Sequence, residues 1–333
     1  MKTGPDTLLG IRDLVVTYPA RKRTGMSLTA VRGVSLDLPE AGIYGLVGES
    51  GSGKSTLAHA VAGLVPAVGG RILFRGEDLA GLESRGRKVQ LVFQDALGSL
   101  SPRRSVLRTL LEPLDHFDLV DRAGRVEKAL ETLETVGLDR ALQDRYPNEL
   151  SGGQRQRVAL ARALVAGPEL VIADEPLSSL DVPAQARIID LILELRDRLG
   201  VAFLFVSHDL STVRRLADSV GVMYAGKLVE EAAADELFRN PSHPYTRALL
   251  AAVPIADPTH PRPAVLGGEP PSPLTPPAGC VFHMRCPERI AVCSVEAPPE
   301  SAVGEPGGMV GRNRELKSGG HRVRCHLCNA TNT

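Results

Sequence analysis

Residues 43–61 read Ile-Tyr-Gly-Leu-Val-Gly-Glu-Ser-Gly-Ser-Gly-Lys-Ser-Thr-Leu-Ala-His-Ala-Val, and this stretch decides the fold. The apolar run 43–47 predicts a buried strand, and residues 57–61 predict a helix. Between them, residues 48–56 (the phosphate loop) have the pattern Gly, four residues, Gly-Lys-Ser. Glycines allow the positive φ values that a concave ring of backbone N–H groups needs, and such a ring binds a polyphosphate.

The polar side chains of the phosphate loop suit the same ligand. Lys54 supplies a cation for the β- and γ-phosphates, Ser55 supplies a hydroxyl for Mg²⁺, and the following helix presents its positive end. A Gly/Ser-rich turn with a solvent-exposed lysine is the ordinary alternative, but the strand-loop-helix context favours nucleotide binding. The other loop residues expected at the nucleotide are Gly48, Ser50, Gly51, Ser52, Gly53 and Thr56.

The composition limits the class of protein. The chain has 333 residues, 43% of them hydrophobic, so it can bury an α/β core and a smaller second unit. Lys plus Arg and Asp plus Glu each total 39, and this balance argues against nucleic acid as a partner. No apolar run approaches the roughly 20 residues that span a bilayer, and residues 1–10 lack a signal-peptide pattern. We therefore expect a cytoplasmic protein.

Four apolar runs end at residues that could contact a nucleotide. In mostly parallel α/β sheets, ligands bind outside the carboxyl ends of the strands, so the four ends predict one site. The runs are 43–47, 89–93, 170–173 and 201–206, followed by Gly48, Gln94, Asp174-Glu175 and Ser207-His208, respectively.

Each polar group at these strand ends has a chemical role in such a site. Asp174 can hold Mg²⁺, directly or through water, and Glu175 can polarise the attacking water. Adjacent carboxylates after a buried strand are costly unless a cation or hydrogen bonds compensate, which favours a metal here. Gln94 can reach the metal or the water, and His208 can reach the γ-phosphate or the water. Taken alone, Gln94 fits a structural role equally well. A lone histidine after a strand is more often structural, and only the place of His208 at the fourth strand end favours a functional role.

Upstream of the phosphate loop, residues 9–18 and 31–38 predict strands, joined through a basic loop at 21–23. Tyr18 ends the first strand. As an isolated residue it is an ordinary strand-end aromatic, although its ring could stack on a purine.

Residues 95–165 have a helical pattern. Residues 106–114 and 125–136 show apolar spacings of three and four, and Gly137 ends the second helix. Ser151 is an N-cap candidate for a further helix that begins Gly152-Gly153-Gln154. Because glycine costs about 1 kcal/mol relative to alanine within a helix, two glycines in the first turn indicate close approach of a phosphate or of another chain.

Together these motifs resemble the ATP-binding-cassette (ABC) ATPases over residues 8–240. The resemblance implies a P-loop NTPase fold of the α/β class, with a mixed-sheet core, an antiparallel β subdomain and an α-helical subdomain at about 95–165. Residues 241–333 would form a small, irregular, Cys-containing extension. The motifs are the phosphate loop, Gln94, residues 150–154 (Leu-Ser-Gly-Gly-Gln), Asp174-Glu175, residues 179–181 (Ser-Leu-Asp) and His208, in that order.

The resemblance also implies a role for each motif, with ATP and Mg²⁺ as ligands. The family works as a head-to-tail dimer in which the Ser151-Gly152-Gly153 segment of one domain completes the site of the other. The implied roles are Tyr18 for adenine stacking, Gln94 for the Q-loop, Glu175 for the catalytic base, Asp181 for the D-loop and His208 for the switch histidine, with Ser55, Gln94 and Asp174 at Mg²⁺ and Ser151 to Gln154 at the nucleotide.

The end of the chain narrows the family. Residues 243–250, 268–273 and 279–287 resemble the C-terminal extension of the ATPases of oligopeptide and dipeptide importers. Ala96 and Pro183 depart from that pattern without touching the catalytic groups. The resemblance implies a peripheral subunit on the cytoplasmic face of the inner membrane that hydrolyses ATP to drive peptide uptake. Its implied partners are a second, related ATPase, two membrane permeases and an extracytoplasmic solute-binding protein.

Other functions stay open from the sequence. Nickel importers share much of the pattern, so the cargo is peptide, nickel or another small solute. ABC proteins of DNA repair carry a very long coiled coil inside the cassette, whereas Gln94 and Ser151 here are close in sequence. ABC proteins of translation carry two cassettes, and this chain has one phosphate loop. A simple nucleotide-binding switch is a third possibility.

The C-terminal region raises two further predictions. Residues 241–277 are proline-rich and predict an extended strap with little regular structure. Five cysteines follow, and thiols gathered in a loop-rich intracellular region favour metal ligands over disulfides. The Cys325-His326-Leu327-Cys328 spacing alone suits zinc, and reduced free thiols are also open. The importer resemblance instead implies a four-iron, four-sulphur cluster. Its ligands would be Cys280, Cys286, Cys293 and Cys325, with Cys328 spare.

Overall fold

The computed structural model describes residues 7–19, 27–253, 266–303 and 320–329. The predicted basic loop at 21–23 lies outside these residues. The chain forms two compact units. The first contains residues 1–38, 43–78 and 207–333, and the second contains residues 39–42 and 79–206.

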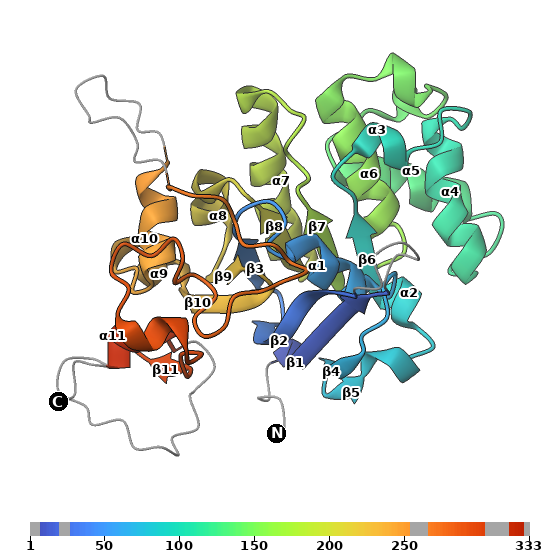
Figure 1. Cartoon of the computed structure of the whole chain (residues 1–333). Helices are drawn as coiled ribbons and strands as arrows, with labels where there is room; N and C mark the ends of the chain where they lie inside the picture. Colours follow the sequence, from blue (N-terminus) through green and yellow to red (C-terminus); the bar gives the residue numbers. More distant parts are fainter. Residues whose placement is uncertain (1–6, 20–26, 254–265, 304–319, 330–333) are drawn as a thin grey trace. The chain divides into compact units, whose positions relative to one another are not determined.

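The first unit begins with an antiparallel sheet of order β2-β1-β4-β5. Its strands are β1 (Thr7–Tyr18), β2 (Leu28–Pro39), β4 (Gly69–Phe74) and β5 (Glu77–Asp78). Leu9 of β1 lies opposite Phe74 of β4, and both side chains are buried. Figure 1 shows the two long strands β1 and β2 side by side. The predicted strands at 9–18 and 31–38 are confirmed, and each begins a few residues earlier than its apolar pattern.

A second group of strands in the first unit carries the phosphate loop. Its order is β11-β12-β10-β9-β3, with β3 parallel to β9 and the other pairs antiparallel. All five residues of β3 are buried, as its apolar run predicts. The strands are β3 (Ile43–Val47), β9 (Ser219–Tyr224), β10 (Lys227–Ala233), β11 (Ser301–Ala302) and β12 (Arg322–Val323). The helices of this unit are α1 (Lys54–Ala62), α8 (Leu210–Leu216), α9 (Ala234–Arg239), α10 (Pro244–Ala251), α11 (His326–Asn329) and the 3₁₀ turn Ala291–Ser294.

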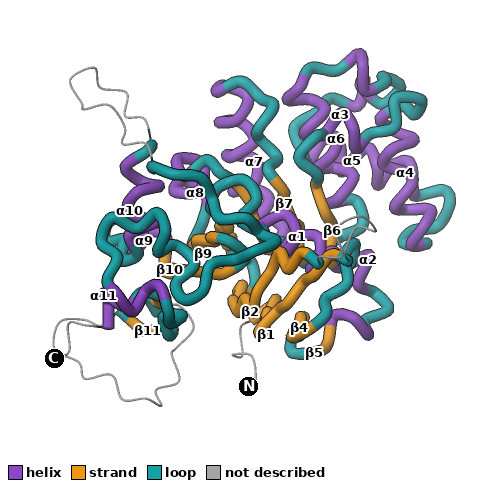
Figure 2. Tube along the Cα trace, viewed as in Figure 1, coloured by secondary structure: helices purple, strands orange, loops and turns teal. Residues whose placement is uncertain are grey.

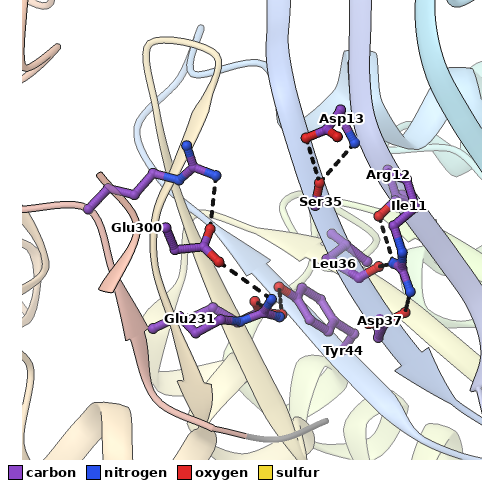
Figure 3. Close-up of polar contacts among 11 residues, drawn as sticks. Ile11, Arg12, Asp13, Ser35, Leu36, Asp37, Tyr44, Glu231 and Glu300 are labelled. Carbon is purple, nitrogen blue, oxygen red and sulfur yellow. Dashed lines mark hydrogen bonds and ion pairs between the residues drawn. The ribbon is translucent and has the colours of Figure 1, made fainter. Parts of the chain in front are cut away.

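A buried polar cluster links three of these strands (Figure 3). The Tyr44 hydroxyl of β3 donates to Glu231 Oε1 of β10 at 2.9 Å. Glu231 also forms an ion pair with Arg322 of β12. Burial raises the pKa of Glu231 to about 7 against the opposing effect of Arg322. The last described segment of the chain is therefore tied to the strand that precedes the phosphate loop.

The second unit contains three parallel strands, in the order β8-β7-β6, and most of the helices (Figure 2). The strands are β6 (Val89–Val92), β7 (Leu170–Asp174) and β8 (Ala202–Ser207), whose last residue belongs to the first unit. The helices are α2 (Arg85–Lys88), α3 (Ala96–Ser99), α4 (Val106–Phe117), α5 (Arg125–Thr135), α6 (Gly152–Leu164) and α7 (Val182–Leu199), with 3₁₀ turns at Leu79–Gly81, Arg140–Leu142 and Pro147–Glu149. Within the described ranges, no helix is both long enough and apolar enough to cross a bilayer.

One prediction from the sequence needs correction. The proline-rich strap at 241–277 is wrong in part, because residues 244–251 form α10. Pro244 occupies the first helical turn, where proline is tolerated, and the His243 side chain accepts the Tyr245 N–H as the N-cap.

Candidate nucleotide-binding site

The phosphate loop has the strand-loop-helix setting that the sequence predicts, between β3 and α1. Gly53 is the N-cap of α1 and has φ +105°, a left-handed value that favours glycine. A Cβ atom at this position would lie 2.4 Å from the Ala30 carbonyl oxygen of β2. The Gly226 N–H donates to the Ser52 carbonyl at 2.8 Å. Neighbouring strands therefore fix the loop from outside.

Lys54 and Ser52 give the phosphate loop its chemistry. Lys54 Nζ is buried and donates to the carbonyl oxygens of Gly48, at 2.8 Å, and Glu49, at 3.0 Å. Ser52 is 4% exposed, and its Oγ has no hydrogen-bond partner among the described residues. A buried hydroxyl without a partner costs about 1–3 kcal/mol, and a phosphate oxygen would satisfy it. The loop thus fits a polyphosphate.

The other candidate residues of the first unit lie close to α1 or on the segment after β8. The Tyr18 hydroxyl is 3.3 Å from Thr56 Oγ1, which places Tyr18 beside the first turn of α1. Ser55 is half-buried in that same turn, and Ser50 and Gly51 are exposed. His208 is exposed, next to Asp209, whose carboxylate caps α8.

In the second unit, the ends of β6 and β7 bring Gln94 and Glu175 together. Gln94 Nε2 donates to Glu175 Oε2 at 3.1 Å. Asp174 is the last residue of β7 and is 5% exposed. Glu175 has φ +46°, an uncommon value for a non-glycine residue, and its N–H donates to the Val206 carbonyl at 2.9 Å. Backbone strain of this kind gathers at functional sites, where surrounding contacts impose it.

The Ser151 segment forms a helix start of a different kind. Ser151 Oγ accepts the Gln154 N–H at 3.2 Å, and Gln154 Oε1 accepts the Ser151 N–H at 2.9 Å, so the pair forms a capping box. The predicted N-cap is therefore confirmed. Asp181 likewise caps α7 by accepting the Ala184 N–H at 2.7 Å.

The two capped helix starts line one cavity of about 790 Å³. Arg155, Arg157 and Arg187 add positive charge to its lining, which suits an anion. The sequence pattern does not single out Arg187, because one exposed arginine on a helix carries no signal of its own. Ser151 to Gln154 and Ser179 to Asp181 all contribute to the lining, so the structure brings these two motifs together.

The cysteines gather near β10 and β12, but they do not form a recognisable metal centre. The Cys280 N–H donates to the Cys293 carbonyl at 2.9 Å, and burial raises the pKa of Cys280. A hydrogen bond from Cys328 lowers the pKa of Cys325. Across the described ranges, no group of three or more His, Cys, Asp or Glu side chains is arranged to hold a metal ion. The structure therefore gives the iron–sulphur and zinc predictions no direct support.

Two residues that the sequence analysis did not assign to the site also contact the phosphate loop. Tyr245 and Arg285 lie far along the chain and both bind Glu49. Such long-range contacts leave no periodic pattern, and the only sequence signal was the position of both residues in the importer-type segments.

Comparison with known proteins places the chain in a family. A family described as "ABC transporter" matches residues 31–178, and one described as "Oligopeptide/dipeptide transporter, C-terminal region" matches residues 229–293. The "Oligopeptide transport ATP-binding protein AppF" of Bacillus subtilis is 43% identical over 338 residues, which cover 97% of this chain and 98% of AppF. The chain therefore belongs to the ABC transporter ATP-binding proteins of the oligopeptide/dipeptide group.

Solved structures agree with this fold. A dimeric post-hydrolysis state of the ATP-binding cassette MJ0796, bound to ADP and Pi, matches with a TM-score of 0.61 and 27% identity, over 68% of this chain and 98% of that chain. The cbiO1 protein of Clostridium perfringens, part of the cbiONQ ABC transporter complex, matches with a TM-score of 0.61 and 26% identity, over 71% of this chain and 92% of its own. The predicted ABC cassette fold is confirmed, and the chain is an ATPase of this family.

Proposed function

We propose that this chain hydrolyses ATP to drive the import of short peptides through a membrane complex. The observation that carries the proposal is the phosphate loop with its buried Lys54 and a Ser52 hydroxyl that has no partner in the described part of the chain. The chain is also similar along nearly its full length to an oligopeptide transport ATP-binding protein.

The proposed chemistry assigns a task to each side chain. The phosphate loop and Lys54 bind the β- and γ-phosphates, and Tyr18 stacks on the adenine. Glu175 accepts a proton from the water that attacks the γ-phosphorus, while the bond to the β-phosphate oxygen breaks. Gln94 and His208 orient the water and the γ-phosphate. Mg²⁺, held by Ser55, Gln94 and Asp174, would neutralise charge that develops on the phosphate oxygens.

The capped start of α6 supplies a second binding surface in this proposal. Gly152 and Gly153 offer their N–H groups, Ser151 its hydroxyl and Gln154 its side-chain amide to the nucleotide of a partner cassette. Asp181 lies in the same cavity lining. The open cavity and its arginines support this role. The partner would be a second ATPase, related or identical to this chain.

The remaining partners follow from the transport role. We place the chain on the cytoplasmic face of the membrane with two permeases and an extracytoplasmic solute-binding protein. Residues 1–240 would form the ATPase domain, with its helical subdomain at about 95–165, and residues 241–333 the extension. The match of the oligopeptide/dipeptide C-terminal family to residues 229–293 supports this extension.

We further propose that four of the cysteines hold a four-iron, four-sulphur cluster. Cys280, Cys286, Cys293 and Cys325 would hold it, with zinc as the alternative. The geometric support is the Cys280 N–H, which donates to the Cys293 carbonyl at 2.9 Å and so holds two of the four cysteines side by side. Iron, sulphide and zinc analysis after anaerobic purification tests it. Colourless protein with one zinc, or with no metal, would exclude the cluster.

The transport proposal is tested by ATP-driven uptake into proteoliposomes that hold the co-expressed complex. Labelled dipeptide, longer peptide and Ni²⁺ are offered in parallel, and the Glu175→Gln variant is the control. We expect peptide uptake that is lost in the variant. Uptake of Ni²⁺ alone would keep the mechanism and change the cargo, and ATP turnover without any uptake would refute a role in importing these solutes.

A further inference from the structure

Glu49, the second residue of the phosphate loop, is held at all three of its polar groups. Its N–H donates to the Tyr245 hydroxyl at 2.9 Å. Its carbonyl oxygen accepts from Lys54 Nζ at 3.0 Å. Its carboxylate receives Arg285, with Nη1 to Oε2 at 2.7 Å and Nη2 to Oε1 at 3.1 Å. Two of these partners, Tyr245 and Arg285, come from residues 243–253 and 266–303 (the C-terminal segment) and lie more than 190 positions away in sequence.

Arg285 is built into this position. Its side chain is 5% exposed, and the pair with Glu49 is bidentate. The rest of the guanidinium donates to the Gly267 carbonyl at 3.0 Å and lies 5.8 Å from the centre of the Tyr224 ring. The hydrogen bond with Glu49 is the main cause that raises the pKa of Arg285. The Glu49 side chain is 26% exposed. A fully exposed ion pair contributes little, but a bidentate pair with a buried guanidinium fixes geometry, and loss of Glu49 would leave the Arg285 charge buried.

Tyr245 is equally well fixed. It is fully buried, and its ring lies 4.6 Å from Tyr224 and 5.3 Å from Phe282, measured between ring centres. Phe282 is 1% exposed and belongs to the same C-terminal segment as Arg285. The packing of its ring in this aromatic cluster holds the Tyr245 hydroxyl against the Glu49 N–H.

The consequence reaches the phosphate-binding lysine. A rotation of Glu49 would move its carbonyl oxygen, which, like that of Gly48, accepts from Lys54 Nζ. The same Glu49 oxygen accepts the Ser52 N–H at 3.2 Å, so the rotation would also alter the ring of N–H groups in the phosphate loop. We propose that Arg285 and Tyr245 are positioning residues, through which the C-terminal segment holds the phosphate loop in the conformation that receives nucleotide. This proposal rests on the proposed function of the loop.

The test uses the full-length chain with three variants, Arg285→Gln, Tyr245→Phe and Glu49→Gln. Equilibrium binding of a fluorescent ATP analogue is measured on the purified chain, and KM and kcat for ATP are measured on the co-expressed complex. We expect Arg285→Gln to raise the analogue's Kd and the KM about tenfold, the effect of losing one charge-assisted hydrogen-bonded pair. We expect kcat to change less, because bound nucleotide restores the loop. Arg285→Lys should recover part of the loss.

A matched control comes from the same segment. Arg247 also pairs with a glutamate, Glu288, through both carboxylate oxygens at 2.6 Å, but this pair is about half exposed and does not touch the phosphate loop. Arg247→Gln should therefore leave Kd and KM unchanged. The Glu49→Gln/Arg285→Gln double variant should be no worse than the single variants, since the residues act as a unit.

The outcomes separate this proposal from its alternatives. Folded Arg285→Gln with wild-type Kd and KM would overturn it, as would equal effects of Arg247→Gln. If Arg285→Gln does not fold, Tyr245→Phe and Glu49→Gln, which keep the side-chain volumes, decide the question by the same readouts. Failure of the transport proposal would appear instead as absent uptake by the wild-type complex, while the nucleotide Kd of the chain stays measurable.

Discussion

The phosphate loop and the start of α6 are both glycine-rich helix starts, yet the chain builds them differently. The loop is shaped from outside, by β2, by Gly226 and by the C-terminal segment. The start of α6 is held by its own capping box and faces an open cavity. A Cβ atom on Gly153 would meet only Ala184 Cβ, at an ordinary 3.6 Å, whereas on Gly53 it would collide with backbone. The fold thus requires glycine at position 53, whereas no contact among the described residues requires it at position 153.

The largest expected effect concerns the lysine of the packed loop. Lys54→Ala should lower the ATPase rate of the assembled complex by about 10²–10³-fold, because a preorganised cation at the phosphates is lost. Steady-state phosphate release measures it. The control is Lys128→Ala, since Lys128 is exposed on α5. Comparable losses in both variants would mean that the loop is not the site of the chemistry.

Gly53→Ala tests whether the packed loop needs its glycine for folding. The left-handed φ and the 2.4 Å approach to Ala30 should together cost about 3 kcal/mol of unfolding free energy. Urea denaturation of the full chain gives this value. A variant as stable as the wild type would show that the loop can rearrange freely, and the contrast between the two helix starts would disappear.

The pH dependence of stability in the His243→Asn variant tests whether His243 holds the backbone of Tyr245 in place. His243 Nδ1 accepts the Tyr245 N–H at 3.0 Å, and burial lowers the pKa of His243 to about 4. Because the folded pKa lies below the ordinary 6.5, its stabilising effect is complete above pH 6.5 and is lost as pH falls toward 4. Asparagine keeps the cap without titrating. Between pH 7.5 and 4.5 the wild type should lose about 2 kcal/mol more than the variant in urea unfolding. Parallel pH profiles would contradict this.

Gly153→Ala should have the smallest effect of these changes, and it should raise the stability of the chain while it lowers the ATPase rate. Alanine in the first turn of α6 should stabilise the chain by about 0.5 kcal/mol, since nothing in the described fold opposes its Cβ. The ATPase rate of the complex should nevertheless fall, by about tenfold, because the methyl group occupies the surface offered to a nucleotide or another chain. Thermal unfolding and phosphate release on one preparation check both signs. Unchanged turnover would make Gly153 an ordinary helix residue.

The sequence predicts well whatever depends on local pattern. The run 43–47, the capped start at Ser151 and the helix at 125–136 were all placed correctly, because burial, capping and periodicity act within a few residues. The many prolines in residues 241–277 predicted an extended strap, but α10 forms there. A proline in the first turn, next to a good N-cap, is compatible with a helix.

What the sequence could not predict are contacts between distant segments. Arg285 and Tyr245 meet Glu49 only because β3, β9 and β10 bring their flanking segments to one place. In a sequence, an arginine in a loop-rich segment has the same appearance whether its partner is solvent or a partly buried carboxylate. The Gln94–Glu175 contact was partly predictable, because the expected parallel sheet implied that the ends of β6 and β7 are neighbours.

The separation between Glu49 and Arg285 also sets an order of events during synthesis. Glu49 of the phosphate loop leaves the ribosome 236 residues ahead of the arginine that contacts it. Since chains begin to fold from the N-terminal end as they are made, a nascent chain carries every nucleotide-binding residue of the loop before the loop can take its final shape. ATP capture would thus mature only after Arg285 has been made, so fragments truncated before residue 285 would bind nucleotide more weakly than chains that contain it.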